Sequence, residues 1–248
     1  MEIDYTMENN KVEPVVSERY GHSCYELKIS GSDAFIIMSE KSDGRWVWYA
    51  PTFTDAYPGS IHAWLFERIL QNGMAIAGID VGESYGNKNG RAIFSRFYSY
   101  LIEKYPLRSR AVLLAQSRGG LMLYNWAIEN PCFVDRIAGI YTVCDIRSYP
   151  GIDIAAMAYK VTVQEMEKKL EQNNPIDRLG SLISNKIRIC HLHGDSDKTV
   201  PIEQNSGKLV SKYKELGGDG RLITIRGAGH EEINEFFKCK ELLHFIIE

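Results

Sequence analysis

The feature that most constrains the fold is a serine that stands between a buried strand and an apolar helix. Residues 111–114 are apolar and predict a strand, and residues 121–127 carry apolar side chains at helical spacing. Between them lies the segment 115–120, Ala-Gln-Ser-Arg-Gly-Gly. The pattern predicts a strand, a tight turn with Ser117 at its apex and a helix, and the two glycines suit a turn in which the chain doubles back closely.

A serine at such an apex has the chemical setting of a nucleophile. Its hydroxyl reacts poorly unless it is exposed beside a base and beside backbone N–H groups that stabilise an oxyanion. An ordinary strand-to-helix turn would produce a similar string of residues. Ser117 is therefore a candidate nucleophile only if the chain also supplies an acid and a base.

Two later strands are each followed by a residue of the required type. Residues 187–193 alternate as a strand and lead into the acidic loop 194–201, which contains Asp197. Residues 221–226 predict another strand, and His230 follows it closely. A serine, an acid and a histidine in this order, each just past a strand end, match the order of a catalytic triad. This joint order argues against an ordinary turn at Ser117.

Composition favours a globular domain and argues against several kinds of partner. The 248 residues are 44% hydrophobic and 25% charged, with a formal net charge of −3 and no basic run, so we expect no nucleic-acid partner. The five cysteines are widely spread and lack zinc-site spacing, so we expect reduced thiols, no metal and no cofactor. A polar amino terminus and the lack of a long apolar run predict a cytoplasmic protein without membrane contact.

The predicted elements alternate between strands and helices, as an α/β protein requires. We expect an antiparallel hairpin from residues 24–30 and 34–38, further strands at 46–50, 74–79 and 137–143, and helices at 60–72, 91–105, 208–216 and 233–247.

One domain, residues 1–248, accounts for the whole chain. Residues 1–20 are expected to form an N-terminal arm, and residues 151–186 a mostly helical, cap-like insertion over the site. A capping box from Thr162 to Glu165 is predicted to start a helix in this insertion.

Together these segments resemble the serine α/β-hydrolase superfamily. The resemblance rests on Ser117 in the tight turn between strand and helix, called the elbow below, on the loop 194–201 (Gly-Asp-Ser-Asp-Lys-Thr-Val-Pro) and on Gly229-His230. It extends over nearly all of the chain after about residue 20. It implies an α/β-hydrolase fold, with a mostly parallel central sheet, an N-terminal antiparallel hairpin and helices on both faces. More narrowly, residues 45–48, 116–121 and 143–151 resemble a bacterial esterase branch found beside carbohydrate esterases.

The resemblance implies a role for each polar residue of the triad. Ser117 would attack an acyl carbonyl, and His230 would take the proton and return it. Asp197, the second aspartate of the Gly-Asp-x-Asp loop, would orient His230, while Asp195 would hold the loop. Asp145 is the alternative acid, because some relatives supply it from the strand after the nucleophile helix.

Further residues are candidates for the oxyanion hole and for substrate contact. The backbone N–H of Arg118 is one expected oxyanion donor, and the second is that of Thr52 or Phe53. Tyr85 and Tyr49 are candidates for contact with the substrate. We expect Trp46 and Trp48, which share one face of a central strand, to belong to the core.

The predicted activity is the hydrolysis of a small-molecule carboxylic ester through an acyl-Ser117 intermediate. A short acyl group on a carbohydrate is the preferred substrate. The alternatives are a serine peptidase or thioesterase, a lyase or acyltransferase on the same fold, and a noncatalytic hydrolase-like binding protein.

Overall fold

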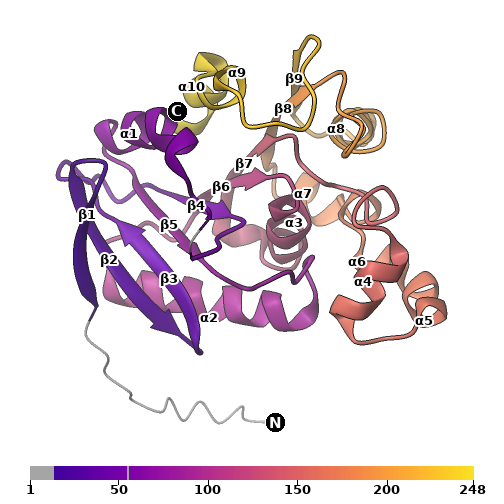
Figure 1. Cartoon of the computed structure of the whole chain (residues 1–248), viewed down its shortest axis with the longest axis horizontal. Coiled ribbons are helices and arrows are strands. Elements are labelled where there is room, and N and C mark those ends of the chain that lie inside the picture. The colour runs from indigo at the N-terminus through magenta and orange to yellow at the C-terminus, as the bar shows by residue number, and fades with distance from the viewer. Residues whose placement is uncertain (1–13, 55) are drawn as a thin grey trace.

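A nine-stranded sheet forms the centre of the protein in the computed structural model, which describes residues 14–54 and 56–248 (Figure 1). Its strand order is β1-β2-β3-β5-β4-β6-β7-β8-β9. The antiparallel part consists of β1 (Val15–Arg19), β2 (His22–Ile29) and β3 (Ser32–Ile37), which pairs with β5. The parallel part consists of β4 (Trp46–Ala50), β5 (Ala75–Ile79), β6 (Ala111–Gln116), β7 (Val134–Ile140), β8 (Arg188–Gly194) and β9 (Gly220–Ile225).

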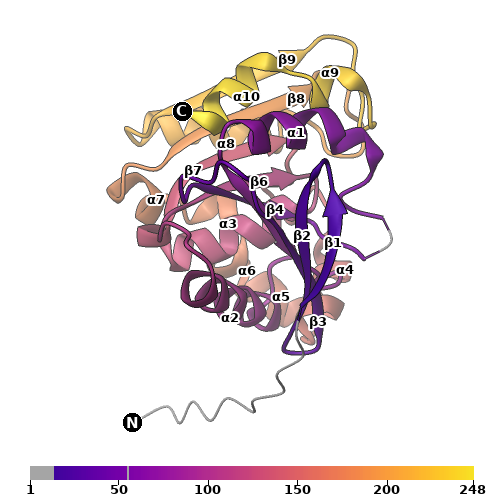
Figure 2. The ribbon, with the colours of Figure 1, turned by 90° about the vertical axis from the view of Figure 1, so that its left-hand side faces the viewer.

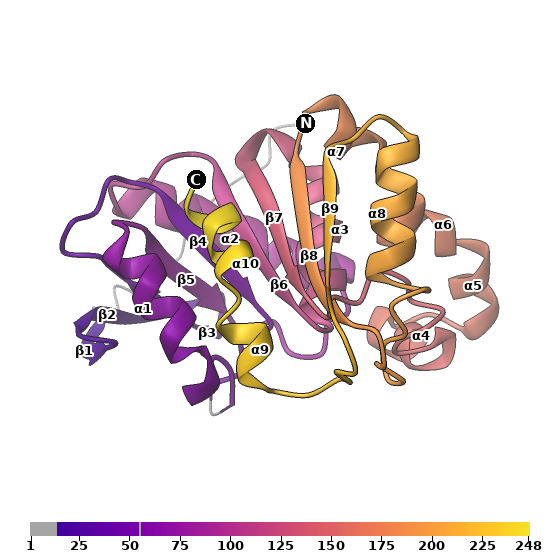
Figure 3. The same ribbon diagram turned by 90° about the horizontal axis from the view of Figure 1, so that it is seen from above.

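Helices cover both faces of this sheet. One face packs against α2 (Lys88–Lys104), α3 (Gly119–Glu129), α7 (Gly180–Ser184) and α8 (Ser206–Glu215). The other face packs against α1 (Ala63–Gln71), α9 (Asn234–Phe237) and α10 (Lys240–Ile247), and α1 lies beside α10 (Figure 3). Because both faces are covered, the central strands are apolar runs, as buried parallel strands are.

The side chains of β4 divide between the two cores. Trp46 and Trp48 point to the face of α2 and α3, where their rings stack with centroids 5.7 Å apart. Val47 and Tyr49 point to the opposite face, because successive residues of a strand alternate in direction. Both tryptophans are fully buried, so the expectation that they belong to the core is confirmed.

The insertion at residues 151–186 is helical. It contains α4 (Ile152–Tyr159), α5 (Val163–Lys168), α6 (Leu170–Asn173) and α7, and α4 and α5 lie at the end of the molecule opposite β1 (Figure 1). The predicted capping box is present: Thr162 Oγ1 accepts a hydrogen bond from the Glu165 N–H, and the Glu165 carboxylate accepts one from the Thr162 N–H. This insertion packs on Tyr85 and on Leu121 of α3, beside the turn that contains Ser117.

Several element bounds differ from the sequence-based expectations by a few residues, and three elements illustrate the differences. Residues 15–19, expected in the arm, form the edge strand β1; the rest of the expected arm up to residue 13 lies outside the described residues. The predicted helix 233–247 is two helices, because the backbone of Cys239 is extended and interrupts the helical hydrogen bonds. Strand β7 lies three residues earlier than predicted at both ends. Among the described residues, no helix is both long and apolar enough to span a membrane.

The carboxyl ends of the parallel strands lie along one edge of the sheet. Figure 2 shows the N-terminal strands β1 to β3 crossing in front of the parallel part of the sheet. Figure 3 shows β6, β7, β8 and β9 running side by side, so that the loops after them meet at one edge. In open α/β sheets this edge is where ligands bind.

Candidate active site

Ser117 occupies a strained turn between β6 and α3. Its φ of 48° lies in the left-handed region, which a residue with a Cβ seldom adopts. Three backbone hydrogen bonds hold it there: its N–H donates to the Ile140 carbonyl at 3.0 Å, and its carbonyl accepts from the N–H groups of Gly120 at 3.0 Å and Val143 at 2.9 Å. The predicted strand, turn and helix are thus all present, with Ser117 at the apex.

The glycines after Ser117 are required by close backbone contacts. A Cβ on Gly119 would lie 2.1 Å from the carbonyl oxygen of Ala50, at the end of β4. A Cβ on Gly120 would lie 2.2 Å from the carbonyl oxygen of Val143. The start of α3 is therefore wedged between two neighbouring chain segments, and only glycine fits at both positions.

The structure brings together Ser117, His230 and Asp197 from three separate loops. Ser117 Oγ lies 2.9 Å from His230 Nε2, and His230 Nδ1 lies 2.7 Å from Asp197 Oδ2. These loops follow β6, β9 and β8, whose carboxyl ends meet at one edge of the sheet. Such an arrangement allows a proton to pass from the serine to the imidazole while the carboxylate stabilises the resulting cation.

Asp197 is buried but well supplied with hydrogen-bond donors. Its Oδ1 accepts from the backbone N–H groups of Thr199 at 3.0 Å and Val200 at 2.8 Å, while Oδ2 faces His230 and also His193 at 3.2 Å. Burial alone would raise the pKa of Asp197, but the hydrogen bonds from His193, His230 and Val200 outweigh it and hold that pKa well below its usual value. The carboxylate is therefore ionised at neutral pH.

The two other aspartates face different partners. Asp195 is exposed, and its Oδ1 accepts from the Gly227 N–H at 2.7 Å, which ties the loop after β8 to the loop after β9. Asp145 is directed toward Arg147, whose Nε lies 2.7 Å away, and toward Asn174. Of the two acids considered from the sequence, it is Asp197 that contacts His230.

The three expected oxyanion donors differ in their hydrogen bonding. The Phe53 N–H donates to the Tyr57 carbonyl at 3.0 Å and is therefore engaged. Within residues 14–54 and 56–248, the backbone N–H groups of Arg118 and Thr52 have no acceptor. Arg118 follows Ser117, and Thr52 lies just after β4, so these two remain the candidates for an oxyanion hole.

A buried polar cluster under His230 was not expected from the sequence. Tyr49 OH donates to Gln116 Oε1 at 2.7 Å, His62 Nε2 lies 2.7 Å from the same oxygen, and Gln116 Nε2 donates to Tyr141 OH at 2.7 Å. The Tyr141 ring packs edge-on against the ring of His230, with centroids 4.7 Å apart. The only sequence signal for this cluster is Gln116, a polar side chain in an otherwise apolar strand.

Tyr49 and Tyr85, both predicted to contact the substrate, have different positions. Tyr49 is fully buried in the cluster just described, so that prediction is wrong; the strand β4 is central, and its side chains face the core rather than solvent. Tyr85 lies between α3 and the insertion, where burial raises its pKa to about 12. Substrate contact by Tyr85 stays a prediction.

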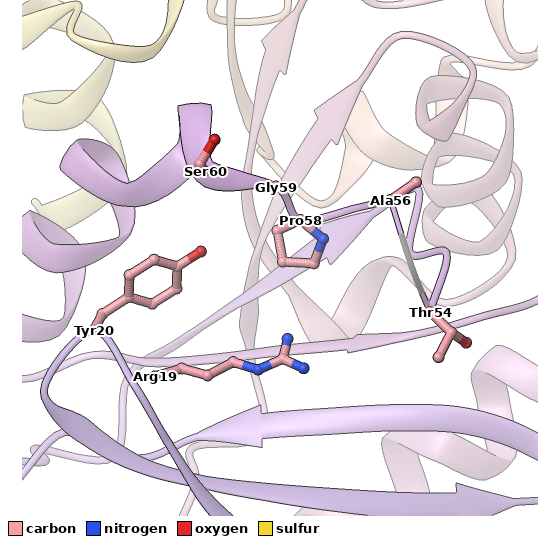
Figure 4. Close-up of a pocket in the computed structure, with 7 residues that line it drawn as sticks. All are labelled: Arg19, Tyr20, Thr54, Ala56, Pro58, Gly59 and Ser60. Atoms are coloured by element: carbon pink, nitrogen blue, oxygen red, sulfur yellow. The ribbon is translucent and has the colours of Figure 1, made fainter.

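Charged and aromatic side chains surround the elbow. Arg118 Nε lies 3.1 Å from a carboxylate oxygen of Glu83, and its guanidinium lies over the ring of Phe53, 5.0 Å from the centroid. Arg118 thus links the loop after β5 to the loop after β4. A surface pocket of about 340 Å³ opens further along that second loop and is lined by residues that include Arg19, Tyr20 and Pro58 (Figure 4).

Comparison with known proteins identifies the fold. No protein-family model and no curated protein matches the chain. The S-formylglutathione hydrolase of Agrobacterium tumefaciens superposes with a TM-score of 0.70 at 12% identity, over 94% of this chain and 97% of that one. The S-formylglutathione hydrolase of Staphylococcus aureus gives 0.71 at 10% identity, over 92% and 98%. The acylaminoacyl peptidase of Pyrococcus horikoshii gives 0.69 at 14% identity, over 95% of this chain but 41% of that one. The chain has the α/β-hydrolase fold, as the resemblance implied.

Proposed function

We propose that this chain, built on the α/β-hydrolase fold, is a serine hydrolase that cleaves carboxylic esters through an acyl intermediate on Ser117. One observation carries the proposal. Ser117, His230 and Asp197 form a continuous line of hydrogen bonds, 2.9 and 2.7 Å long, at the carboxyl edge of the sheet. The fold that the chain shares with solved hydrolases supports the same class of reaction.

In the first half of the reaction, Ser117 Oγ attacks the ester carbonyl carbon while His230 Nε2 takes the hydroxyl proton. The imidazolium that forms is stabilised by the ionised Asp197, which accepts the His230 Nδ1 hydrogen. The negative charge on the former carbonyl oxygen is stabilised by the backbone N–H groups of Arg118 and Thr52.

Collapse of the tetrahedral intermediate completes acylation. The bond to the alcohol oxygen breaks, and the proton on His230 passes to this oxygen, so that a neutral alcohol leaves and an acyl-Ser117 ester remains. In the second half, His230 takes a proton from water, the water oxygen attacks the acyl carbon, and the same proton returns to Ser117 Oγ as the carboxylic acid departs.

A short acyl group is the part of the substrate that we propose with most structural support. The two S-formylglutathione hydrolases bear names that specify a formyl group, the smallest acyl group, and they match this chain over nearly their whole length. A carbohydrate as the alcohol rests on the resemblance of residues 45–48, 116–121 and 143–151 alone. The aromatic support for a sugar is weaker than the sequence implied, since Trp46, Trp48 and Tyr49 are buried.

A thioester is the second candidate substrate, because the same two names specify a thioester of glutathione. Attack on a thioester uses the same oxyanion and differs in the leaving group, which is a thiol. The peptidase alternative has less support, since the peptidase aligns over only 41% of its own chain and therefore carries a large part that this chain does not match.

The proposal is tested by the hydrolysis of p-nitrophenyl esters from acetate to octanoate. We expect turnover to be highest for the shortest acyl chains. Ser117→Ala should lower kcat/KM by roughly 10³-fold or more, because the nucleophile is lost while the fold is kept. Acetylated sugars and an acyl thioester assayed in parallel separate the candidate leaving groups.

Ser196→Ala is the matched control. Ser196 is an exposed serine in the loop that contains Asp197, and its hydroxyl donates to Asp195 rather than to His230. This variant should retain the wild-type rate. Labelling with a fluorophosphonate probe should occur in the wild type and in Ser196→Ala but not in Ser117→Ala. A wild type that neither turns over esters nor reacts with the probe would be a hydrolase-like binding protein, and the proposal would fall.

A further inference from the structure

A second chain of buried hydrogen bonds leads from the core to Asp197. His191 and His193 lie on the same side of β8, and both are fully buried. The chain starts at Tyr124 of α3, whose hydroxyl lies 2.8 Å from His191 Nε2. Ser206, the first residue of α8, lies 2.9 Å from His191 Nδ1 and 2.8 Å from His193 Nδ1. His193 Nε2 then lies 3.2 Å from Asp197 Oδ2.

The positions of the hydrogens in this chain follow from its last link. His193 Nε2 faces two acceptors, the Asp197 carboxylate and the Val200 carbonyl at 2.9 Å, so this nitrogen must carry a hydrogen. In the neutral imidazole, His193 Nδ1 is then an acceptor, and the Ser206 hydroxyl donates to it. Ser206 has only this one hydrogen, so it accepts the hydrogen of His191 Nδ1.

The Tyr124 end of this series of hydrogen bonds has its donors and acceptors in the same order. Burial lowers the pKa of His191 to about 3, so that this ring is neutral at working pH. Neutral His191 with a hydrogen on Nδ1 accepts the Tyr124 hydroxyl hydrogen at Nε2. Every hydrogen bond in this series is therefore donated in one direction, from Tyr124 through His191, Ser206 and His193 to Asp197.

We propose that His193 is a positioning residue, which fixes the Asp197 carboxylate through its Nε2 hydrogen, and that Tyr124, His191 and Ser206 hold it in the tautomer that does so. The inference rests on the proposed function, because it assigns His193 an effect on the triad. It also explains why β8, which is buried from Ile189 onward, carries two histidines where packing alone would favour apolar residues.

The effect on the pH profile of catalysis has a definite sign. Asp197 Oδ2 is shared between His193 and His230, so the hydrogen from His193 offsets part of the negative charge that stabilises the His230 imidazolium. Loss of the His193 donor would leave Asp197 more basic and less firmly oriented. The imidazolium form of His230 would then be favoured, and the acidic limb of the kcat/KM profile would move to higher pH.

Other titratable groups lie on or next to the loops that contain His230 and Asp197, and they must stay constant in the test. Tyr141 packs on the His230 ring, Glu231 accepts from the Gly229 N–H beside it, and Glu232 follows on the same loop. Lys198 is exposed next to Asp197. Variants at His193 leave all of these in place, so a difference between two such variants reports on the His193 donor.

The experiment compares His193→Gln with His193→Asn in the full chain. The amide nitrogen of glutamine reaches about as far as Nε2 of histidine and keeps a donor at Asp197, whereas that of asparagine reaches only as far as Nδ1. We expect His193→Asn to lower kcat/KM about tenfold, because the Asp197 carboxylate loses the hydrogen bond that holds it in position, and to shift the acidic limb upward. His193→Gln should restore both toward the wild-type values.

The comparison of the two variants decides whether His193 positions Asp197. Equal rates and equal acidic limbs for the two variants would overturn the positioning role, even if both were less stable than the wild type. If His193→Asn does not fold, Ser206→Ala replaces it; this variant removes the donor to His193 Nδ1 and should shift the acidic limb in the same direction. Fluorophosphonate labelling of the wild type is measured first, because its absence would refute the serine hydrolase itself rather than the role of His193.

Discussion

At the scale of single residues, Asp197 connects the site to the rest of the protein. One carboxylate accepts from two backbone N–H groups of its own loop and faces two imidazoles, one from β8 and one from the loop after β9. Its pKa is held below the usual value by these donors, although burial opposes them. The same contacts that keep Asp197 ionised therefore also contribute to the stability of the fold.

This linkage predicts how stability depends on pH. The folded-state pKa of Asp197 lies below its unfolded value of about 3.9, so the unfolded chain binds the proton first as the pH falls. The stabilisation is present at neutral pH and is lost progressively as the pH falls below about 5. In Asp197→Asn, the free energy of unfolding measured in urea should fall less steeply between neutral and acidic pH. Ser117→Ala, which keeps every donor to Asp197, should retain the wild-type slope, and an unchanged slope in Asp197→Asn would contradict this account.

At the scale of elements, the junction of β6 and α3 determines where Ser117 and the proposed oxyanion donors lie. Gly119 brings the first turn of α3 against the end of β4, just before the loop that contains Thr52. A side chain at this position must displace either the helix or the backbone at Ala50. The contact between Gly119 and Ala50 thus fixes both the elbow and the loop that contains Thr52.

We predict that Gly119→Ala destabilises the protein by about 1–3 kcal/mol, because the added methyl meets backbone that cannot move freely. It should also lower kcat/KM, since the Ala50 end of β4 would shift. Gly180→Ala is the matched control: Gly180 begins α7, is exposed, and an added Cβ would meet nothing within 4 Å. Urea unfolding and ester turnover of both variants provide the check, and similar values for the two would refute the argument.

Elements with strong periodicity could be predicted from the sequence, and those defined by pairing could not. The strand at 46–50 was predicted with its observed bounds because five apolar residues stand between turn signals. Strand β1 was missed, since Val15 and Val16 are 63% and 62% exposed and neither marks a buried face. The break between α9 and α10 has no Gly or Pro to announce it.

The same distinction applies to the site. Ser117, Asp197 and His230 could be selected because each follows a strand, and parallel strands bring their carboxyl ends together. The buried polar partners could not be selected, since nothing in a single sequence indicates that Gln116 meets His62, or that His193 meets Ser206. Such pairs depend on how helices pack across the sheet.

At the scale of the whole molecule, an aromatic core joins the sheet to its helices. Trp48 lies at its centre, with the ring of Trp126 from α3 at 4.7 Å and that of Phe94 from α2 at 5.0 Å. Trp46 stacks on Trp48 and donates its Nε1 hydrogen to the Arg108 carbonyl at 2.9 Å. Among the described residues, the Nε1 of Trp48 has no hydrogen-bond partner although it is buried.

The two tryptophans therefore predict unequal costs of the same substitution. Trp46→Phe loses a hydrogen bond as well as ring volume, whereas Trp48→Phe loses ring volume but also removes an unpaired buried N–H group. We expect Trp46→Phe to be the more destabilising by about 1 kcal/mol in urea unfolding. The reverse ranking would show that the unpaired N–H of Trp48 carries no penalty.

The contact between Ser117 and His230 joins residues that are 113 positions apart. The nucleophile elbow is present in the chain long before the loop after β9, which supplies the histidine, has been made. A nascent chain still attached to the ribosome thus holds Ser117 without His230, its proposed base, until β9 and the loop that follows it have emerged. Reactivity at Ser117 would consequently begin only after the loop that contains His230 has folded against the turn that contains Ser117.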